Sequence, residues 1–248
     1  MNFFSLFKRK IKYKLKKKYS IDKDNFSKKN LDNLFHHYGS DKSEIFKISN
    51  SPGHGFSLTY EKYLKSLVGK NINILELGSF AGASAAAFVQ YLQNANVFCF
   101  DINISNFKYS SKNIHVYGVD IKNKKKVQKF FIEIFDKNNF KNFDLIIDDG
   151  SHQLSDILYS LNFFFKYLKQ GGIYVIEDYK HPNYYKYNYD INDIFVDDLL
   201  LSLKSKNFFK SSIFSKEDQT YLINSVKEIN TYKGNLKDSD ICFIKKKN

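Results

Sequence analysis

Two adjacent carboxylates and a histidine follow one apolar run of this chain. Residues 143–154 read FDLIIDDGSHQL, so Asp148 and Asp149 close a segment that is apolar enough to be a buried strand, and His152 comes three residues later. Adjacent aspartates at the end of a buried segment repel each other and lose hydration. They are therefore expected where a cation binds or where a ligand needs hydrogen-bond acceptors.

Short apolar runs alternate with helical patterns on both sides of this motif. Such alternation predicts a doubly wound α/β fold, in which helices cover both faces of a parallel sheet. We expect helices at 58–68, 82–93, 124–137 and 154–168, the last of them ended by the C-cap glycines Gly171 and Gly172. We expect strands at 72–77, 96–101, 114–117, 143–148 and 173–177, followed by a strand pair at 225–233 and 240–246. The predicted fold is a Rossmann-like, seven-stranded, mostly parallel sheet with a C-terminal antiparallel strand pair.

Acidic residues lie at or just past the ends of the five central strands, where ligands of doubly wound sheets bind. The first strand ends in ILELGSFAG, and its glycines would let the backbone approach a ligand. Its E-x-G-x-x-x-G spacing is not the dinucleotide fingerprint. The acid of the second strand, Asp101, could accept hydrogen bonds from both hydroxyls of a ribose, as an adenosine-containing cofactor requires. Some of these acids could instead be helix caps, since Asp149-Gly150-Ser151 suits a helix start.

The series ELGSFAG, FCFD, YGVD, IIDDGSH and YVIED resembles the class I S-adenosylmethionine-dependent methyltransferases. DDGSH followed by a strand that ends in ED is similar, more narrowly, to the metal-dependent sugar O-methyltransferases, such as those that methylate deoxysugars on macrolides. HHYGSDK at 36–42 and HGFSLTYE at 54–61 resemble the lead-in of that family. Phe56, in place of the usual tyrosine, and the long spacing from Lys42 to His54 depart from the family pattern on the substrate side.

The resemblance implies S-adenosylmethionine as the cofactor and a divalent metal beside it. The metal would be held by Asp149, Glu177 and Asp178, three hard oxygen donors that suit Mg²⁺ or Mn²⁺. Asp148, on the opposite face of its strand, would order the cofactor side or a loop. The cofactor-binding residues expected on this basis are Ser57, Glu76, Gly78, Ser84, Asp101, Asp120 and Asp148.

His152 is the residue that we expect to act as the catalytic base. A hydroxyl bound to a divalent cation becomes more acidic, as metal-bound water does, and a histidine can then remove its proton. His152 lies about one helical turn beyond Asp149, so both side chains can face one oxygen. The alternative is a histidine that begins a helix and bonds to the backbone. The predicted enzyme is an O-methyltransferase that acts on a sugar hydroxyl of a nucleotide sugar, a surface or capsular polysaccharide precursor, or a glycosylated natural product.

The net charge of +13 is concentrated at the N-terminus, because residues 1–20 hold eight basic residues and no acid. The remaining residues carry a net charge of only +5, which counts against an RNA methyltransferase and leads us to expect no nucleic-acid partner. Residues 1–20 can form a basic amphipathic helix that lies on an anionic membrane surface. A solvated tail, or a helix that docks on a partner subunit, would explain the same pattern. Its apolar residues are Phe3, Phe4, Phe7, Ile11 and Leu15.

We expect two parts, a basic N-terminal extension at 1–30 and a methyltransferase domain at 31–248. No apolar run is long enough to span a membrane, and Cys99 and Cys242 read as buried free thiols. These features predict a cytoplasmic protein whose tail can lie at the inner face of the membrane. The protein can also form a homo-oligomer. The tyrosine-rich stretch 179–190 could be a substrate lid or a solvated loop. An RNA or other small-molecule methyltransferase remains as the first alternative function, followed by a nucleotide-binding oxidoreductase and a non-catalytic scaffold.

Overall fold

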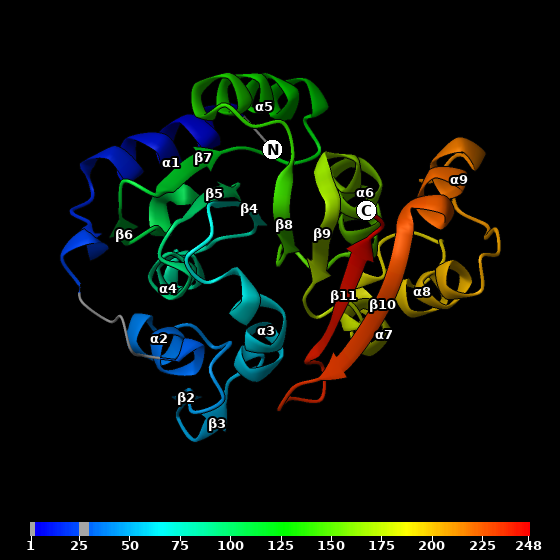
Figure 1. Cartoon of the computed structure of the whole chain (residues 1–248), viewed down its shortest axis with the longest axis horizontal. Helices are drawn as coiled ribbons and strands as arrows, with labels where there is room; N and C mark the ends of the chain where they lie inside the picture. Colours follow the sequence, from blue (N-terminus) through cyan, green and yellow to red (C-terminus); the bar gives the residue numbers. More distant parts are fainter. Residues whose placement is uncertain (1–2, 25–29) are drawn as a thin grey trace. The chain divides into compact units, whose positions relative to one another are not determined.

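The structure is a computed structural model that describes residues 3–24 and 30–248, with side chains of the first helix described from Ser5 onward. Parts of the predicted 1–30 extension, residues 1–2 and 25–29, lie outside the described residues, as do the side chains of Phe3 and Phe4. The chain forms two compact units, Met1–Phe140 and Lys141–Asn248 (Figure 1).

The first unit begins with the predicted N-terminal helix, α1, which spans Phe3–Leu15. A two-residue strand, β1 (Tyr19–Ser20), then pairs in parallel with β6 (Tyr109–Ser110). Three short elements follow before the sheet. They are the 3₁₀ turn η1 (Ile21–Lys23), the helix α2 (Leu31–Tyr38), and the hairpin of β2 (Lys47–Ile48) and β3 (Ser51–Pro52).

Helix α2 begins and ends at residues that stabilise helix termini. The side chain of Asn30 accepts a hydrogen bond from the backbone N–H of Asn33, and Gly39 ends the helix at a φ of 79°. An asparagine at the N-cap satisfies a free helix N–H, and glycine adopts the left-handed conformation without a Cβ clash. Helix α3 (Ser57–Leu64) and the 3₁₀ turn η2 (Lys65–Leu67) lead to the sheet and confirm the helix predicted at 58–68.

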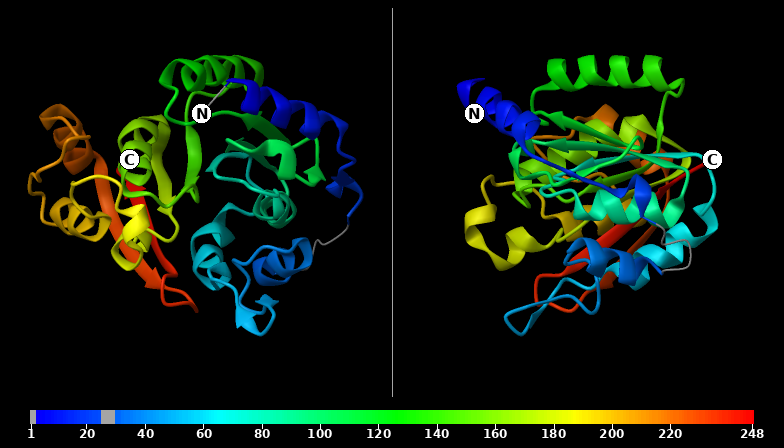
Figure 2. Two further views of the ribbon diagram at one scale, coloured as in Figure 1. Left: turned by 180° about the vertical axis from the view of Figure 1, so that it is seen from behind. Right: turned by 90° about the vertical axis from the view of Figure 1, so that its left-hand side faces the viewer.

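Three parallel strands form the sheet of the first unit, in the order β4, β5, β7. Figures 1 and 2 show α5 on one face of β5 and β7 and α4 on the other. Strands β4 and β5 are almost wholly buried, as their near-continuous apolar runs require, whereas three of the five residues of β7 are half-buried. The elements are β4 (Ile72–Leu77), α4 (Ala83–Leu92), β5 (Ala95–Asp101), η3 (Ile104–Asn106), β7 (Ile114–Gly118) and α5 (Lys124–Asn138).

Four strands form the sheet of the second unit, in the order β10, β11, β9, β8. Strands β8 and β9 are parallel, whereas β11 runs antiparallel to both β9 and β10. Over both units the seven strands give the predicted α/β fold, mostly parallel with an antiparallel C-terminal pair. The elements are β8 (Phe143–Asp148), α6 (Leu154–Phe164), η4 (Phe165–Tyr167), β9 (Leu168–Ile176), α7 (His181–Tyr184), η5 (Lys186–Asn188), α8 (Val196–Lys204), α9 (Lys216–Ser225), β10 (Val226–Lys233) and β11 (Asp240–Lys246).

The predicted role of Gly171 and Gly172 as helix C-cap is wrong. The helix ends earlier, and the glycines lie within β9, where the register against β8 shifts between Phe143 and Leu145. Gly171 has a φ of 73°, and its N–H donates to the carbonyl of Lys247 at 3.0 Å. A glycine that adopts a positive φ at an irregularity of a sheet is typical of a β-bulge.

Among the described helices, none combines the length and the apolar character that crossing a membrane requires. The two cysteines are buried and free, as predicted.

Candidate functional site

Three side chains of the second unit bring their potential ligand atoms together just beyond the carboxyl ends of β8 and β9. Nε2 of His152 lies 3.7 Å from Oδ1 of Asp149 and 4.0 Å from Oδ2 of Asp178. One ligand atom from each of the three residues lies within 4.8 Å of the others, which is close enough for one ion to contact all three. The structure therefore brings together the predicted base and two of the three predicted metal ligands.

Parallel pairing of β8 with β9 explains how residues so far apart in sequence meet. Asp148 is in register with Ile176, so Asp149 and Asp178 both follow the same edge of the sheet. The N–H of Glu177 donates to the carbonyl of Asp148 at 3.0 Å and extends this pairing by one residue. Asp149 is the first residue after β8 and Asp178 is the second after β9, so parallel pairing of these two strands brings the acids to one edge of the sheet.

The backbone at this site is unusual for side-chain-bearing residues. His152 has a φ of 56° and Asp178 a φ of 50°, both in the left-handed region. Non-glycine residues in that region are uncommon and cluster at functional sites, where the surrounding structure holds them. The hydroxyl of Ser151 donates to Asp156 in the first turn of α6 at 2.5 Å, which fixes the loop that carries His152.

Glu177, the third predicted metal ligand, is not part of this three-residue group. Its side chain is 2% exposed, and Asp178 next to it is 4% exposed. Burial of two adjacent carboxylates is unfavourable unless cations or hydrogen-bond donors compensate them.

Asp148 is buried beneath the site rather than beside its three residues. It is 4% exposed, and burial raises the pKa of its carboxyl to about 8; the nearby hydroxyl of Ser160 opposes this increase, and the charges of Asp149 and Asp156 add to it. Burial also raises the pKa of the Tyr174 phenol on β9, and the charge of Asp148 adds to this increase. Asp148 thus lies among residues of α6 and β9, and its expected role, ordering the cofactor side or a loop, stays a prediction.

A second histidine lies beside His152. The ring centroid of His181, at the start of α7, is 5.6 Å from that of His152, and the ring centroid of Tyr185 is 4.3 Å from that of His181. Nδ1 of His181 is 2.6 Å from the amide nitrogen of Asn188, and its Nε2 is 3.9 Å from Asp238. Together the rings of His181 and Tyr185 form an aromatic wall next to the metal-ligand group.

The sequence pattern alone does not predict this aromatic wall or the residues that hold it. His181 follows a strand end and precedes a proline, so it reads equally well as a turn residue. Asn188 and Asp238 come from a 3₁₀ turn and from the turn between β10 and β11, and only the folded chain brings them to His181.

In the first unit, Glu76 lies at the end of β4 beneath the glycine turn. It is fully buried, and its Oε1 accepts a hydrogen bond of 2.5 Å from the hydroxyl of Ser84, the second residue of α4. Gly78 and Gly82 have φ values of 87° and 78°, and a Cβ at Gly82 would overlap the ring of Phe107. The turn therefore requires glycine at both positions.

Asp101 lies at the end of β5, adjacent to this turn. Its two carboxylate oxygens accept from the backbone N–H groups of Phe80, at 2.7 Å, and Asn103, at 2.5 Å. A carboxylate has about four lone-pair sites, so Asp101 can still accept from ribose hydroxyls. Asp120 follows β7, the neighbour of β5, and accepts from the N–H of Lys122 at 3.0 Å.

Ser57, another predicted cofactor residue, is engaged elsewhere in the first unit. Its hydroxyl donates to Oδ1 of Asp32 at 2.8 Å, and the N–H of Glu44 donates to the same oxygen at 2.6 Å. Ser57 is 1% exposed, so its described contacts are those of a buried helix start.

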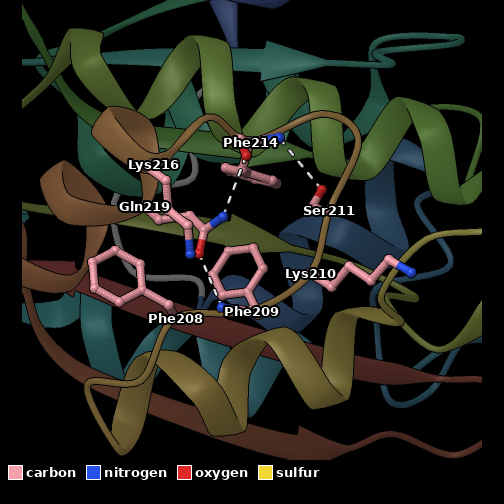
Figure 3. Close-up of a pocket in the computed structure, with 7 residues that line it drawn as sticks. All are labelled: Phe208, Phe209, Lys210, Ser211, Phe214, Lys216 and Gln219. Carbon is pink, nitrogen blue, oxygen red and sulfur yellow. Dashed lines mark hydrogen bonds between the residues drawn. The ribbon is translucent and has the colours of Figure 1, made fainter.

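A cavity of about 440 Å³ lies between α8 and α9 of the second unit (Figure 3). Phe208, Phe209 and Phe214 line it, and Gln219 bonds to the backbone of two of them, accepting from the N–H of Phe209 at 2.9 Å and donating to the carbonyl of Phe214 at 3.3 Å. Its lining contains no acid and no histidine, so it offers none of the groups that the predicted chemistry needs.

A family model, curated proteins and solved structures all resemble this chain. Residues 75–179 match a family described as "Methyltransferase domain", and this range contains the glycine turn, Asp101 and the metal-ligand group. L-olivosyl-oleandolide 3-O-methyltransferase of Streptomyces antibioticus is 29% identical over 132 residues, which are 50% of this chain and 32% of that protein. The uncharacterized protein R132 of Acanthamoeba polyphaga mimivirus is 23% identical over 117 residues, 44% of this chain and 52% of that protein. The chain thus spans about a third to a half of these relatives.

Solved structures agree on the fold. The MycE methyltransferase from the mycinamycin biosynthetic pathway, in complex with Mg and SAH, has a TM-score of 0.67 and 20% identity, covering 89% of this chain and 55% of MycE. A complex of MycE with Mg, SAH and mycinamycin VI gives the same TM-score at 19% identity. With its domain match and its fold, the chain resembles the class I S-adenosylmethionine-dependent methyltransferases and, among them, the sugar O-methyltransferases.

Proposed function

We propose that this protein is an S-adenosylmethionine-dependent, metal-assisted O-methyltransferase that acts on a sugar hydroxyl. The observation that carries the proposal is the group of Asp149, His152 and Asp178, whose ligand atoms converge at the strand ends of a methyltransferase domain. The names of similar proteins support the acceptor class, because one relative is a 3-O-methyltransferase of a glycosylated macrolide and MycE is described with Mg, SAH and mycinamycin VI.

The donor set fits a hard divalent cation. Asp149, Glu177 and Asp178 provide carboxylate oxygens, the ligands that Mg²⁺ and Mn²⁺ prefer, and no cysteine lies among them. Asp178 and Glu177 are buried at this position, and a bound cation would stabilise their charged forms. When bound, S-adenosylmethionine supplies an electrophilic methyl group, and the metal lowers the pKa of an acceptor hydroxyl.

His152 accepts the proton that the acceptor hydroxyl loses. Its Nε2 faces Asp149 and Asp178, so a hydroxyl held near these carboxylates lies within reach of the imidazole. The left-handed backbone at His152 and the hydrogen bond from Ser151 to Asp156 hold this orientation. The same geometry allows a second role for His152 as a nitrogen ligand of the metal. The two roles differ in the affinity for Mg²⁺, which falls on loss of the imidazole only if His152 is a ligand.

Residues of the first unit bind the cofactor in this proposal. Asp101 and Asp120 accept from the nucleoside, and the turn at Gly78 brings backbone close to it. Glu76 and Ser84 hold the end of β4 and the start of α4 together through their hydrogen bond. Ser57 then acts by ordering the first unit, and Asp148 acts by ordering the second.

We further propose that residues 31–248 carry the methyl-transfer chemistry and that residues 1–30 are an extension. The acceptor is a nucleotide sugar, a surface polysaccharide precursor or a glycosylated natural product. The wall of His181 and Tyr185 is placed to contact it, because aromatic rings pack against the apolar faces of sugars and His181 adjoins the proposed base.

Calorimetric titration of S-adenosylhomocysteine and of NAD into the purified protein tests this function. We expect micromolar binding of S-adenosylhomocysteine and none of NAD. Asp101→Asn should weaken binding of S-adenosylhomocysteine by about tenfold or more, because it removes a charged acceptor. Asp22→Asn is the matched control, since Asp22 also accepts two hydrogen bonds in the first unit, from Ser111 and Lys112, but lies away from the strand ends. Binding of NAD instead would favour an oxidoreductase and contradict the proposal.

A further inference from the structure

Helix α1 presents an apolar stripe to solvent. Phe7, Ile11 and Leu15 recur every four residues and therefore share one face of the helix. Their exposed fractions are 55%, 42% and 82%, which is high for large apolar side chains. Exposed apolar side chains are ordinary when they are scattered, but three in a row on one helix face form a surface that a partner can cover.

The opposite side of α1 is anchored to the first unit. The guanidinium of Arg9 donates to the carbonyl of Ile102 at 2.9 Å, and Nζ of Lys16, just past the helix, donates to the carbonyl of Asn106 at 3.1 Å. The ring of Tyr13 packs edge-on against Phe107 at 6.4 Å. Because these contacts hold one side of the helix, the stripe of Phe7, Ile11 and Leu15 is directed outward.

These anchoring contacts place α1 on the loop that follows β5 (Figures 1 and 2). Ile102 directly follows Asp101, and the side chain of Lys10 lies close to Gly118 at the end of β7. The helix is thus a fixed part of the first unit. A ligand that covers its outer side would hold the whole unit at a defined orientation.

Lysines border the stripe. Lys8, Lys12 and Lys14 are exposed, and residues 1–20 contain no acidic side chain that could neutralise them. A second copy of the helix would bring the same positive charge against this one, so self-association through the stripe is electrostatically unfavourable. RNA would satisfy the lysines but would leave the apolar side chains of Ile11 and Leu15 without a partner. An anionic lipid surface satisfies both, with headgroups for the lysines and acyl chains for the stripe.

We propose that α1 docks the protein on an anionic membrane surface through Phe7, Ile11 and Leu15, with Lys8, Lys12 and Lys14 contacting the lipid headgroups. This proposal does not depend on the methyl-transfer function.

Vesicle co-sedimentation of the full-length protein tests the proposal. We expect binding to phosphatidylcholine vesicles that contain phosphatidylglycerol, a loss of about tenfold or more on vesicles of phosphatidylcholine alone, and weakening of the binding by salt. The triple variant Phe7→Ser, Ile11→Ser, Leu15→Ser should lose binding to the same degree. All three side chains are exposed, so the melting temperature of this variant should match that of the wild type.

A charge variant and its matched control separate specific docking from general attraction. Lys8→Gln, Lys12→Gln, Lys14→Gln should weaken vesicle binding by about tenfold or more. The control Lys65→Gln, Lys70→Gln, Lys227→Gln removes the same charge from exposed lysines elsewhere and should bind as the wild type does.

Results of three kinds would overturn the proposal. The first kind is a lack of specificity: an equal loss of vesicle binding in both lysine variants, or binding to neutral vesicles that equals binding to anionic vesicles. The second is a dimer in solution that the serine variant dissociates, which would make a second copy the partner. The third is salt-sensitive retention of RNA in a filter assay, abolished by Lys8→Gln, Lys12→Gln, Lys14→Gln, in a protein that does not sediment with vesicles.

Discussion

Nε2 of His152 lies 3.7 Å from Oδ1 of Asp149, and the two residues are only three positions apart. The left-handed φ of His152 turns the chain so that both side chains face the same point, to which Asp178 also contributes. This geometry suits two arrangements. In the first, Asp149 and Asp178 bind the metal and His152 is the base; in the second, all three residues bind one ion.

The variant His152→Asn tests the role of the imidazole. Asparagine tolerates the left-handed backbone better than most residues, so the loop should keep its shape. As the catalytic base, His152 contributes about 10²- to 10⁴-fold to the rate, and the variant should lose that factor in kcat while its affinity for Mg²⁺ stays unchanged. Steady-state kinetics and Mg²⁺ titration measure the two quantities. A weakened Mg²⁺ affinity would show that His152 is a metal ligand instead.

The variant Asp178→Asn tests the metal assignment. Asp178 is buried and its carboxylate belongs to the three-residue group, so we expect the affinity for Mg²⁺ to fall by about tenfold or more while the affinity for S-adenosylhomocysteine is retained. Asp144→Asn is the matched control, because Asp144 is an acid of the same unit that pairs with Lys169 at 3.0 Å away from the group. Unchanged Mg²⁺ binding in Asp178→Asn would exclude this carboxylate as a ligand.

Glu177→Gln completes that test, because Glu177 was predicted as a ligand and lies outside the group of Asp149, His152 and Asp178. A loss of Mg²⁺ affinity comparable to that of Asp178→Asn would support the three-carboxylate assignment. Normal affinity in Glu177→Gln, together with a loss in His152→Asn, would support the group as the structure presents it.

The variant Tyr185→Leu tests the aromatic wall. The ring of Tyr185 is 4.3 Å from that of His181, and its exposed fraction of 36% leaves part of it open to a ligand. We expect a rise of about fivefold or more in KM for the acceptor, with kcat and the affinity for S-adenosylhomocysteine nearly unchanged. Tyr189→Leu is the control from the same segment, because Tyr189 stacks on Phe195 at 4.8 Å instead. Equal effects of the two variants would mean that the segment acts only through its folding.

The pH dependence of stability should reveal His115 in the first unit. Burial lowers the pKa of this histidine, with a smaller contribution from the positive charge of Lys137, and its ring stacks on Phe98 at 4.7 Å. Because the folded state disfavours the protonated form, the stabilisation is complete above the unfolded-state pKa and is lost as the pH falls. His115→Phe keeps the stacking but cannot be protonated. Its free energy of unfolding, measured by denaturant titration between pH 7 and pH 5, should therefore decrease less than that of the wild type.

An equal decrease in both proteins would show that His115 does not contribute to the acid sensitivity. Glu133→Gln is a suitable comparison, because it removes a charge from the same unit without removing a buried histidine.

The sequence predicted the strands well, because each central strand is a short and almost wholly apolar run. Strand β8 has the predicted bounds, and the acid that ends it, Asp148, leads directly to Asp149. The convergence of Asp149 with Asp178 also follows from sequence once β8 and β9 are neighbours in a parallel sheet. Such features depend on local pattern and on one general rule of topology.

Features that depend on distant parts of the chain could not be predicted. Gly171 reads as a helix C-cap, but the bond from its N–H to the carbonyl of Lys247 at the end of the chain places it in a bulge of β9. The positions of Asn188 and Asp238 around His181 likewise depend on tertiary structure. The left-handed backbone of His152 has no signal in residue type, since glycine or asparagine would be the usual choice there.

Metal-dependent methyl transfer is the most direct test of the proposed function. Purified protein would be incubated with methyl-labelled S-adenosylmethionine and a panel of nucleotide sugars and deoxysugar macrolides, with Mg²⁺ or with excess EDTA, in the wild type and in Asp149→Asn. We predict that the label enters a sugar hydroxyl only in the wild type with Mg²⁺ and that re-added Mg²⁺ restores the transfer after EDTA. Transfer that proceeds equally with EDTA, or equally in Asp149→Asn, would contradict the role assigned to Asp149 and Asp178.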